Sequence, residues 1–180
     1  MKIDPNKTWK RVEERLATET DPVLRRNLEI VRDHMKAEAC GDIDRLMQTL
    51  SAHPAYHAYG APPEYSPEGT ESIRSFYDAF VASGAGRLEF DLDRLLVDRH
   101  CVLTEGTMRM AYPGRILHLL GIEVDEENEL YMFETRMAVL WPIDDAGKIL
   151  GEDTYAEGDG FFGIENRKLG PGDIGSVTDA

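Results

Sequence analysis

Cysteine, long apolar runs and positive charge are all scarce in this sequence. Its two cysteines, Cys40 and Cys101, have no partner at the spacing of a zinc or redox motif, so no disulfide framework is expected. The longest apolar run, Met137 to Trp141, is far shorter than the ~20 residues of a membrane-spanning helix. The N-terminus has no apolar stretch to act as a signal peptide. We therefore expect a cytoplasmic protein with no membrane partner.

The charge balance and the absence of several motifs argue against further classes of protein. Twenty basic residues stand against 34 acidic ones, a formal net charge of −14, which opposes attraction to nucleic acid or anionic lipid. The histidines show no HxH or HExxH spacing, so no metal site is expected. A Gly-x-Ser-x-Gly elbow, a phosphate loop and a dinucleotide fingerprint are also missing. We therefore expect no nucleic-acid partner and no cofactor.

What the chain does contain is an ordinary globular composition, 42% hydrophobic and 30% charged over 180 residues, which favours one domain. Apolar residues recur at helical spacing in the first part of the chain. Asp21 is placed to cap a helix that begins at Pro22 and is closed by Gly41, and Asp42 is placed to cap the next. The expected helices are 9–16, 22–40, 43–50 and 70–83.

From Arg87 onward the apolar spacing changes to two, which is typical of strands. The expected strands are 88–97, 101–111, 130–143 and 148–156, the last two joined by a hairpin turn at 144–147. Residues 51–69 are predicted to be irregular around a short extended piece, 55–59, and residues 115–124 to be either a strand or a helical insertion. The order predicts an α+β fold in which a curved antiparallel sheet wraps around the helices.

Three segments follow from this order: an N-terminal helical extension, 1–20, a single domain, 21–169, and a disordered tail, 170–180. Both faces of the two long strands are at least half apolar. We therefore expect a homodimer formed through the outer face of the sheet. A further hypothesis is that the protein is an assembly adaptor that binds its partner through this face. A homodimer that covers the face would remove the reason for this hypothesis.

Three segments resemble the SnoaL-like branch of the nuclear transport factor 2-like superfamily. They are Ala37 to Met47, Glu68 to Tyr77 and the hairpin Asp145 to Glu152. The resemblance covers about residues 35–157 and implies a cone-shaped half-barrel with a deep apolar pocket, commonly a dimer, that needs no cofactor. Relatives include ketosteroid isomerases, limonene-epoxide hydrolases, polyketide cyclases and non-catalytic binding proteins, so the fold alone does not choose a function.

The alternation of the strands, combined with the geometry that the resemblance implies, predicts the residues that line this pocket. They are Thr104, Met108, Tyr131, Phe133, Thr135, Met137, Glu152 and Thr154 from the strands, Tyr56, His57 and Tyr59 from the irregular segment, and Tyr77 from the fourth helix.

Glu152 is the leading catalytic candidate because a carboxylate in an apolar cavity suits general acid or base work. The alternative is that it pairs with an arginine or lies at the rim. A one-residue bulge would turn Asp153 inward in its place. His57 is a candidate proton shuttle, or else a structural histidine. Tyr59 and Tyr77 are candidate donors to a developing oxyanion, with core packing as the alternative for Tyr77.

The expected function is proton transfer, as in an isomerase, dehydratase or cyclase, on a small apolar oxygenated molecule. At the positions where catalytic groups of relatives align, however, this chain carries Gly106, Met108, Val139 and Thr154. The alternative is therefore a non-catalytic small-molecule binding protein with the same fold.

Overall fold

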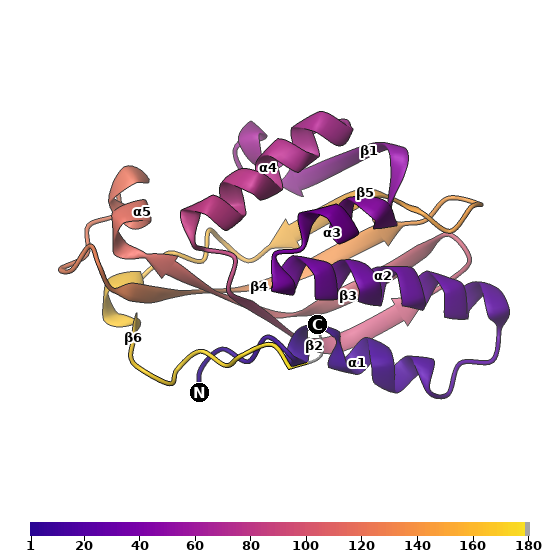
Figure 1. The fold of residues 1–180 in the computed structure, drawn as a ribbon, viewed down its shortest axis with the longest axis horizontal. Helices are drawn as coiled ribbons and strands as arrows, with labels where there is room; N and C mark the ends of the chain where they lie inside the picture. Colours follow the sequence, from indigo (N-terminus) through magenta and orange to yellow (C-terminus); the bar gives the residue numbers. More distant parts are fainter. Residues whose placement is uncertain (179–180) are drawn as a thin grey trace.

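The structure, a computed structural model, describes residues 1–178 and shows one curved sheet with helices against its concave face (Figure 1). The helices are α1 (Lys7–Leu16), α2 (Pro22–Cys40), α3 (Ile43–Thr49), α4 (Thr70–Ser83) and α5 (Gly114–Leu119), with short 3-10 turns at Pro63–Tyr65 and Ile164–Asn166. The strands are β1 (Leu50–Tyr59), β2 (Leu88–Val97), β3 (Cys101–Pro113), β4 (Leu130–Pro142), β5 (Ile149–Ala156) and β6 (Lys168–Leu169). The predicted α+β class is confirmed.

The helix ends follow the capping residues. The Asp21 side chain accepts hydrogen bonds from the Val23 and Leu24 amides at 2.8 and 3.3 Å, and this satisfies two of the free N–H groups at the start of α2. Gly41 ends α2 in the left-handed conformation, with φ of 68°, which glycine adopts without steric cost. These local contacts set where α2 lies and therefore which of its side chains face the sheet.

The main path of the sheet has the strand order β1-β5-β4-β3-β2, with β6 paired to β4. β1 runs parallel to β5, and the other pairs are antiparallel. Two expectations change here. The extended piece predicted at 55–59 is a strand of ten residues, and the undecided element at 115–124 begins as the helix α5. The β1 strand is held by β5, which is distant in sequence, and by the nearby Pro67 carbonyl, which accepts from the Tyr56 amide at 3.0 Å.

The hydrophobic core lies between the concave face and the helices. The helix α1 contributes Trp9, Val12 and Leu16 to the same core as the strands, so residues 1–20 pack as part of the domain. No helix in residues 1–178 has the length and apolar character needed to cross a membrane.

The two ends of the chain lie together on the outer face of the sheet (Figure 1). Ile3 is fully buried against Ala111 and Leu169, with Ile174 packed beside them. The amides of Lys2 and Ile3 donate to the Asp173 carbonyl at 2.8 and 2.9 Å. The tail was predicted to be disordered, and through residue 178 this differs from the structure, because the N-terminal segment supplies hydrogen-bond and apolar partners. Residues 179–180 lie outside the described residues.

Candidate functional site

The register of β5 places Glu152 on the concave face. Val139, a core residue of β4, lies opposite Thr154, and Glu152 is two residues before Thr154, so both side chains point toward the helices. Tyr56 of β1 lies beside Glu152 in the parallel pair and points the same way. The Glu152 side chain is 15% exposed, so most of it is surrounded by protein.

Two buried side chains meet Glu152 from the helices. The Tyr77 hydroxyl, on α4, donates to Glu152 Oε1 at 3.0 Å. His34 on α2 is fully buried, and its Nε2 lies 3.2 Å from the same oxygen. The Tyr56 and Tyr77 hydroxyls are 3.2 Å apart. A carboxylate, an imidazole and two phenols from four different elements therefore form one polar cluster inside the fold.

A second carboxyl group, Glu38, is half-buried on the same helix as His34. It is one helical turn after His34, and residues four apart on a helix share a face. Burial, together with the charge of Glu152, raises the pKa of Glu38 to about 8. At neutral pH Glu38 therefore carries a proton.

The two phenols stay protonated for a similar reason. Burial first, and then the charge of Glu152, raise the pKa of Tyr56 and of Tyr77 well above that of a free tyrosine. Both hydroxyls are therefore available as neutral hydrogen-bond donors. The cluster thus combines a proton-bearing carboxyl group, a second carboxyl group and neutral donors in one place.

The other residues predicted to line the pocket lie on the concave face with their own partners or in the core. Thr104 is fully buried, accepts from Trp141 Nε1 at 2.9 Å and donates to the Val139 carbonyl. Thr135 donates to the Glu157 carbonyl at 2.9 Å. The remaining members are buried or partly buried: Met108, Tyr131, Phe133, Met137 and Thr154. They supply apolar surroundings and no free reactive group.

The predicted placement of His57 and Tyr59 in this pocket is wrong. Because β1 is a regular strand, alternate side chains leave its opposite faces, and Tyr56 takes the inward position. His57 Nδ1 pairs with Asp153 Oδ1 at 2.7 Å on the outer face, and Tyr59, 52% exposed, stacks on Tyr155. Asp153, held in reserve for an inward turn, is on the same outer face as His57.

Sequence reasoning missed His34 and Glu38. On α2 they lie beside the apolar stripe that includes Val31 and Met35, together with the buried Asn27. Polar residues that recur on the buried face of an amphipathic helix indicate a buried polar contact. That pattern was visible in the sequence, although it does not say which groups these side chains would meet.

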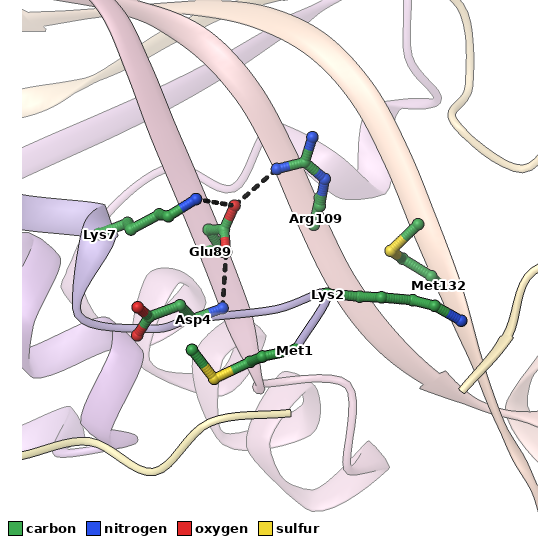
Figure 2. Close-up of a pocket in the computed structure, with 7 residues that line it drawn as sticks. All are labelled: Met1, Lys2, Asp4, Lys7, Glu89, Arg109 and Met132. Carbon is green, nitrogen blue, oxygen red and sulfur yellow. Dashed lines mark hydrogen bonds and ion pairs between the residues drawn. The ribbon is translucent and has the colours of Figure 1, made fainter. Parts of the chain in front are cut away.

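Two depressions open on the outer face, and neither contains Glu152, Glu38 or His34. Figure 2 shows one of them, where Glu89 lies between Lys7 and Arg109. The Glu89 carboxylate accepts from Arg109 and from the Asp4 amide, both at 2.6 Å. Because its charge is fully paired, Glu89 fastens the N-terminal segment to β2 rather than offering a reactive group.

No group of three or more His, Cys, Asp or Glu side chains within residues 1–178 is arranged to hold a metal ion.

The profile of the SnoaL-like domain family matches residues 31–150, and the chain belongs to this family. No curated protein sequence matches the chain.

Solved structures support the same fold at low sequence identity. A SnoaL-like polyketide cyclase, so described, from Shewanella denitrificans OS-217 has a TM-score of 0.62 and 13% identity, over 76% of this chain and 92% of that chain. An epoxide hydrolase of M. tuberculosis, similar to limonene-epoxide hydrolase, has a TM-score of 0.60 and 18% identity, over 81% and 94%. SalBIII, an epoxide hydrolase/cyclase-like enzyme of pyran ring formation in salinomycin, has a TM-score of 0.56 and 15% identity, over 73% and 91%.

Proposed function

We propose that this protein is a cofactor-independent enzyme that transfers protons on a small, apolar, oxygenated molecule. The reaction class is that of isomerases, dehydratases and cyclases, which share the need for an acid and a base on one substrate. The observation that carries the proposal is the position of Glu152 on the concave face, where the Tyr77 hydroxyl donates to it, together with the raised pKa of Glu38 on α2, to which the charge of Glu152 contributes.

The two carboxyl groups divide the roles. Glu38 is the general acid, because its pKa of about 8 keeps it protonated at neutral pH. Glu152, which accepts the Tyr77 hydroxyl, is the general base. Two carboxyl groups whose surroundings separate their protonation states are a recurrent means of running acid and base chemistry on one substrate.

Among the reactions of this class, ring closure of a hydroxy-epoxide uses both groups in one step. Glu152 takes the proton of the substrate hydroxyl, whose oxygen bonds to an epoxide carbon. The carbon–oxygen bond of the epoxide breaks, and its oxygen takes the proton of Glu38. The product is an isomer of the substrate, so no co-reactant is consumed, and exchange with solvent returns a proton from Glu152 to Glu38 before the next turnover. The relatives whose names include cyclase and epoxide hydrolase support this choice.

The test uses 5,6-epoxyhexan-1-ol as the probe and measures tetrahydropyran-2-methanol by gas chromatography. We expect turnover by the wild type and a loss of about 100-fold or more in both Glu38→Gln and Glu152→Gln. Asp153→Asn is the matched control, because it changes the neighbouring carboxylate of the same strand on the opposite face. Equal rates in wild type and Glu152→Gln would reject Glu152 as the base.

A specific observation favours the non-catalytic alternative. Three aromatic rings, those of Tyr112, Phe133 and Phe161, pack on one another inside the fold, with ring centroids 4.9 to 5.7 Å apart. A binding protein would open this cluster around a ligand without changing the ligand. The expected result for a binder is a rise in melting temperature with the same probe and no product, in wild type and Glu152→Gln alike.

A homodimer through the outer face and a cytoplasmic location also stay proposals. A row of leucines on that face supports the dimer. Neighbouring strands place these leucines opposite one another: Leu96 of β2, Leu103 of β3 and Leu140 of β4. Leu96 is 64% exposed. We expect Leu96→Glu to convert a dimer into a monomer in sedimentation analysis. Leu119→Glu, on α5 and 82% exposed, is the control that leaves the mass unchanged. A wild-type monomer at micromolar concentration would reject the dimer.

A further inference from the structure

The partners of Thr49 determine which atom donates in its hydrogen bond with His34. Thr49 Oγ1 lies 2.6 Å from the Leu46 carbonyl and 2.7 Å from His34 Nδ1. A carbonyl only accepts, so the single hydroxyl proton of Thr49 goes to Leu46. Thr49 must then accept from His34, which places a proton on Nδ1. The Leu46 carbonyl is in the last turn of α3, where carbonyl groups lack partners within the helix.

The other ring nitrogen of His34, Nε2, faces Glu152, the proposed catalytic base. This nitrogen lies 3.2 Å from Glu152 Oε1 and 3.4 Å from the Tyr77 hydroxyl. The Tyr77 hydroxyl is closer to Glu152 Oε1, at 3.0 Å, so its proton goes to the carboxylate. Nε2 and Oε1 are therefore left facing each other, and this contact is favourable only with a proton on one of the two atoms.

We propose that His34 is the positioning residue of the proposed catalytic base, carrying a proton on each ring nitrogen and donating from Nε2 to Glu152 Oε1. This inference rests on the proposed function for its catalytic meaning. Two donors, Tyr77 and His34, then hold Oε1, and Oε2 is the oxygen that meets the substrate. Thr49 fixes the ring from behind, as an orienting group does for a catalytic histidine.

The surroundings of the ring leave Glu152 as its charged partner. His34 is fully buried, and the groups against it come from four other elements: Thr49 of α3, Tyr77 of α4, Trp141 of β4 and Glu152 of β5. On its own helix, Glu38 lies one turn away and is protonated at neutral pH. A protonated ring paired with ionised Glu152 is neutral as a pair, which suits burial.

The test is the nitrogen NMR spectrum of the histidine rings at pH 7, recorded on the full chain without any ligand. His34→Gln assigns the signals of His34. We expect both His34 nitrogens in the protonated range in the wild type. In Glu152→Gln, the side-chain amide can donate to the ring, so Nε2 moves to the unprotonated range while Nδ1 stays protonated. An unprotonated Nε2 in the wild type, or one unchanged in Glu152→Gln, overturns the proposal.

The chain provides a matched control and a second variant. His57 and Asp153 form another histidine–carboxylate pair, on the outer face, so Asp153→Asn must leave the His34 signals unchanged. Thr49→Val removes the acceptor of Nδ1, and we expect it to release the ring and alter the Nδ1 signal, whereas Thr49→Ser keeps the wild-type spectrum. An unchanged Nδ1 signal in Thr49→Val also overturns the proposal.

Turnover separates this inference from the proposed function. With the hydroxy-epoxide probe, we expect His34→Gln to lower kcat about 100-fold with little change in KM, because the base is misplaced rather than lost from substrate binding. If the NMR spectra are as expected and no variant or wild type turns over the probe, the proposed function fails and the His34–Glu152 pairing stands. If turnover occurs and His34→Gln retains full kcat, the positioning role fails alone.

Discussion

Replacing Glu38 by glutamine should stabilise the protein by an amount that grows with pH. Burial and the charge of Glu152 oppose the ionisation of Glu38 in the folded chain and raise its pKa from the 4.5 of a free glutamate to about 8. Between these two values the folded state keeps a proton that the unfolded state loses. The free energy of unfolding of the wild type therefore falls as pH rises through this window.

The size of the effect follows from the shift. Each pH unit inside the window costs the wild type up to about 1.4 kcal/mol, so between pH 5 and pH 8 the cost grows by about 3 to 4 kcal/mol. Glutamine does not titrate and carries no such cost. For a chain of this size, 3 kcal/mol corresponds to a melting temperature higher by roughly 6 to 12 °C in Glu38→Gln at pH 8.

The assay is urea unfolding of wild type and Glu38→Gln at pH 5, 6, 7 and 8. Glu29→Gln is the matched control on the same helix, because the Glu29 side chain is 43% exposed and makes a surface pair with Arg25. We expect it to change the free energy of unfolding by less than about 1 kcal/mol at every pH. A difference between wild type and Glu38→Gln that stays constant from pH 5 to pH 8 would refute the raised pKa of Glu38 and with it the general acid.

Three further predictions concern stability and are checked by urea unfolding at pH 7. Tyr77→Phe removes the donor to Glu152 and is expected to cost about 1 to 3 kcal/mol; no loss would contradict the cluster. Gly151→Ala places a Cβ 1.6 Å from the Ala55 carbonyl oxygen, so β1 and β5 must separate, at a cost above about 3 kcal/mol. Wild-type stability would show that the strands are not in close contact there. Ile3→Ala is expected to cost about 2 to 5 kcal/mol, whereas a loss below 0.5 kcal/mol would show that the chain ends are not packed on the sheet.

Helix ends and strand faces were predictable because they depend on neighbours in the sequence. Asp21, Pro22 and Gly41 delimit α2 through contacts within a few residues. The inward position of Glu152 follows from alternation, since β5 pairs with β1 in unbroken register from Gly151 to Tyr155. The family profile and the related folds agree with this order of elements.

The strand β1 and the tail were mispredicted because their partners are remote. Nothing within residues 51–69, rich in proline and tyrosine, indicates that β5 lies alongside, and regular pairing with β5 is what turns His57 and Tyr59 away from Glu152. Likewise, residues 170–178 are ordered by residues 1–6 at the other end of the chain. In both cases hydrogen bonds to a distant segment outweigh the local preference.

The sequence by itself determined the helices α1 to α4, the strands β2 to β5 and the face of β5 that carries Glu152, because capping and alternation act over a few residues. Only the tertiary structure decided what Glu152 meets. His34 on α2 and Tyr77 on α4 reach it from elements far away in the chain, and its charge helps to raise the pKa of Glu38 on α2. Their hydrogen bonds and protonation depend on burial and on distances of about 3 Å, and both exist only once the helices have packed onto the sheet.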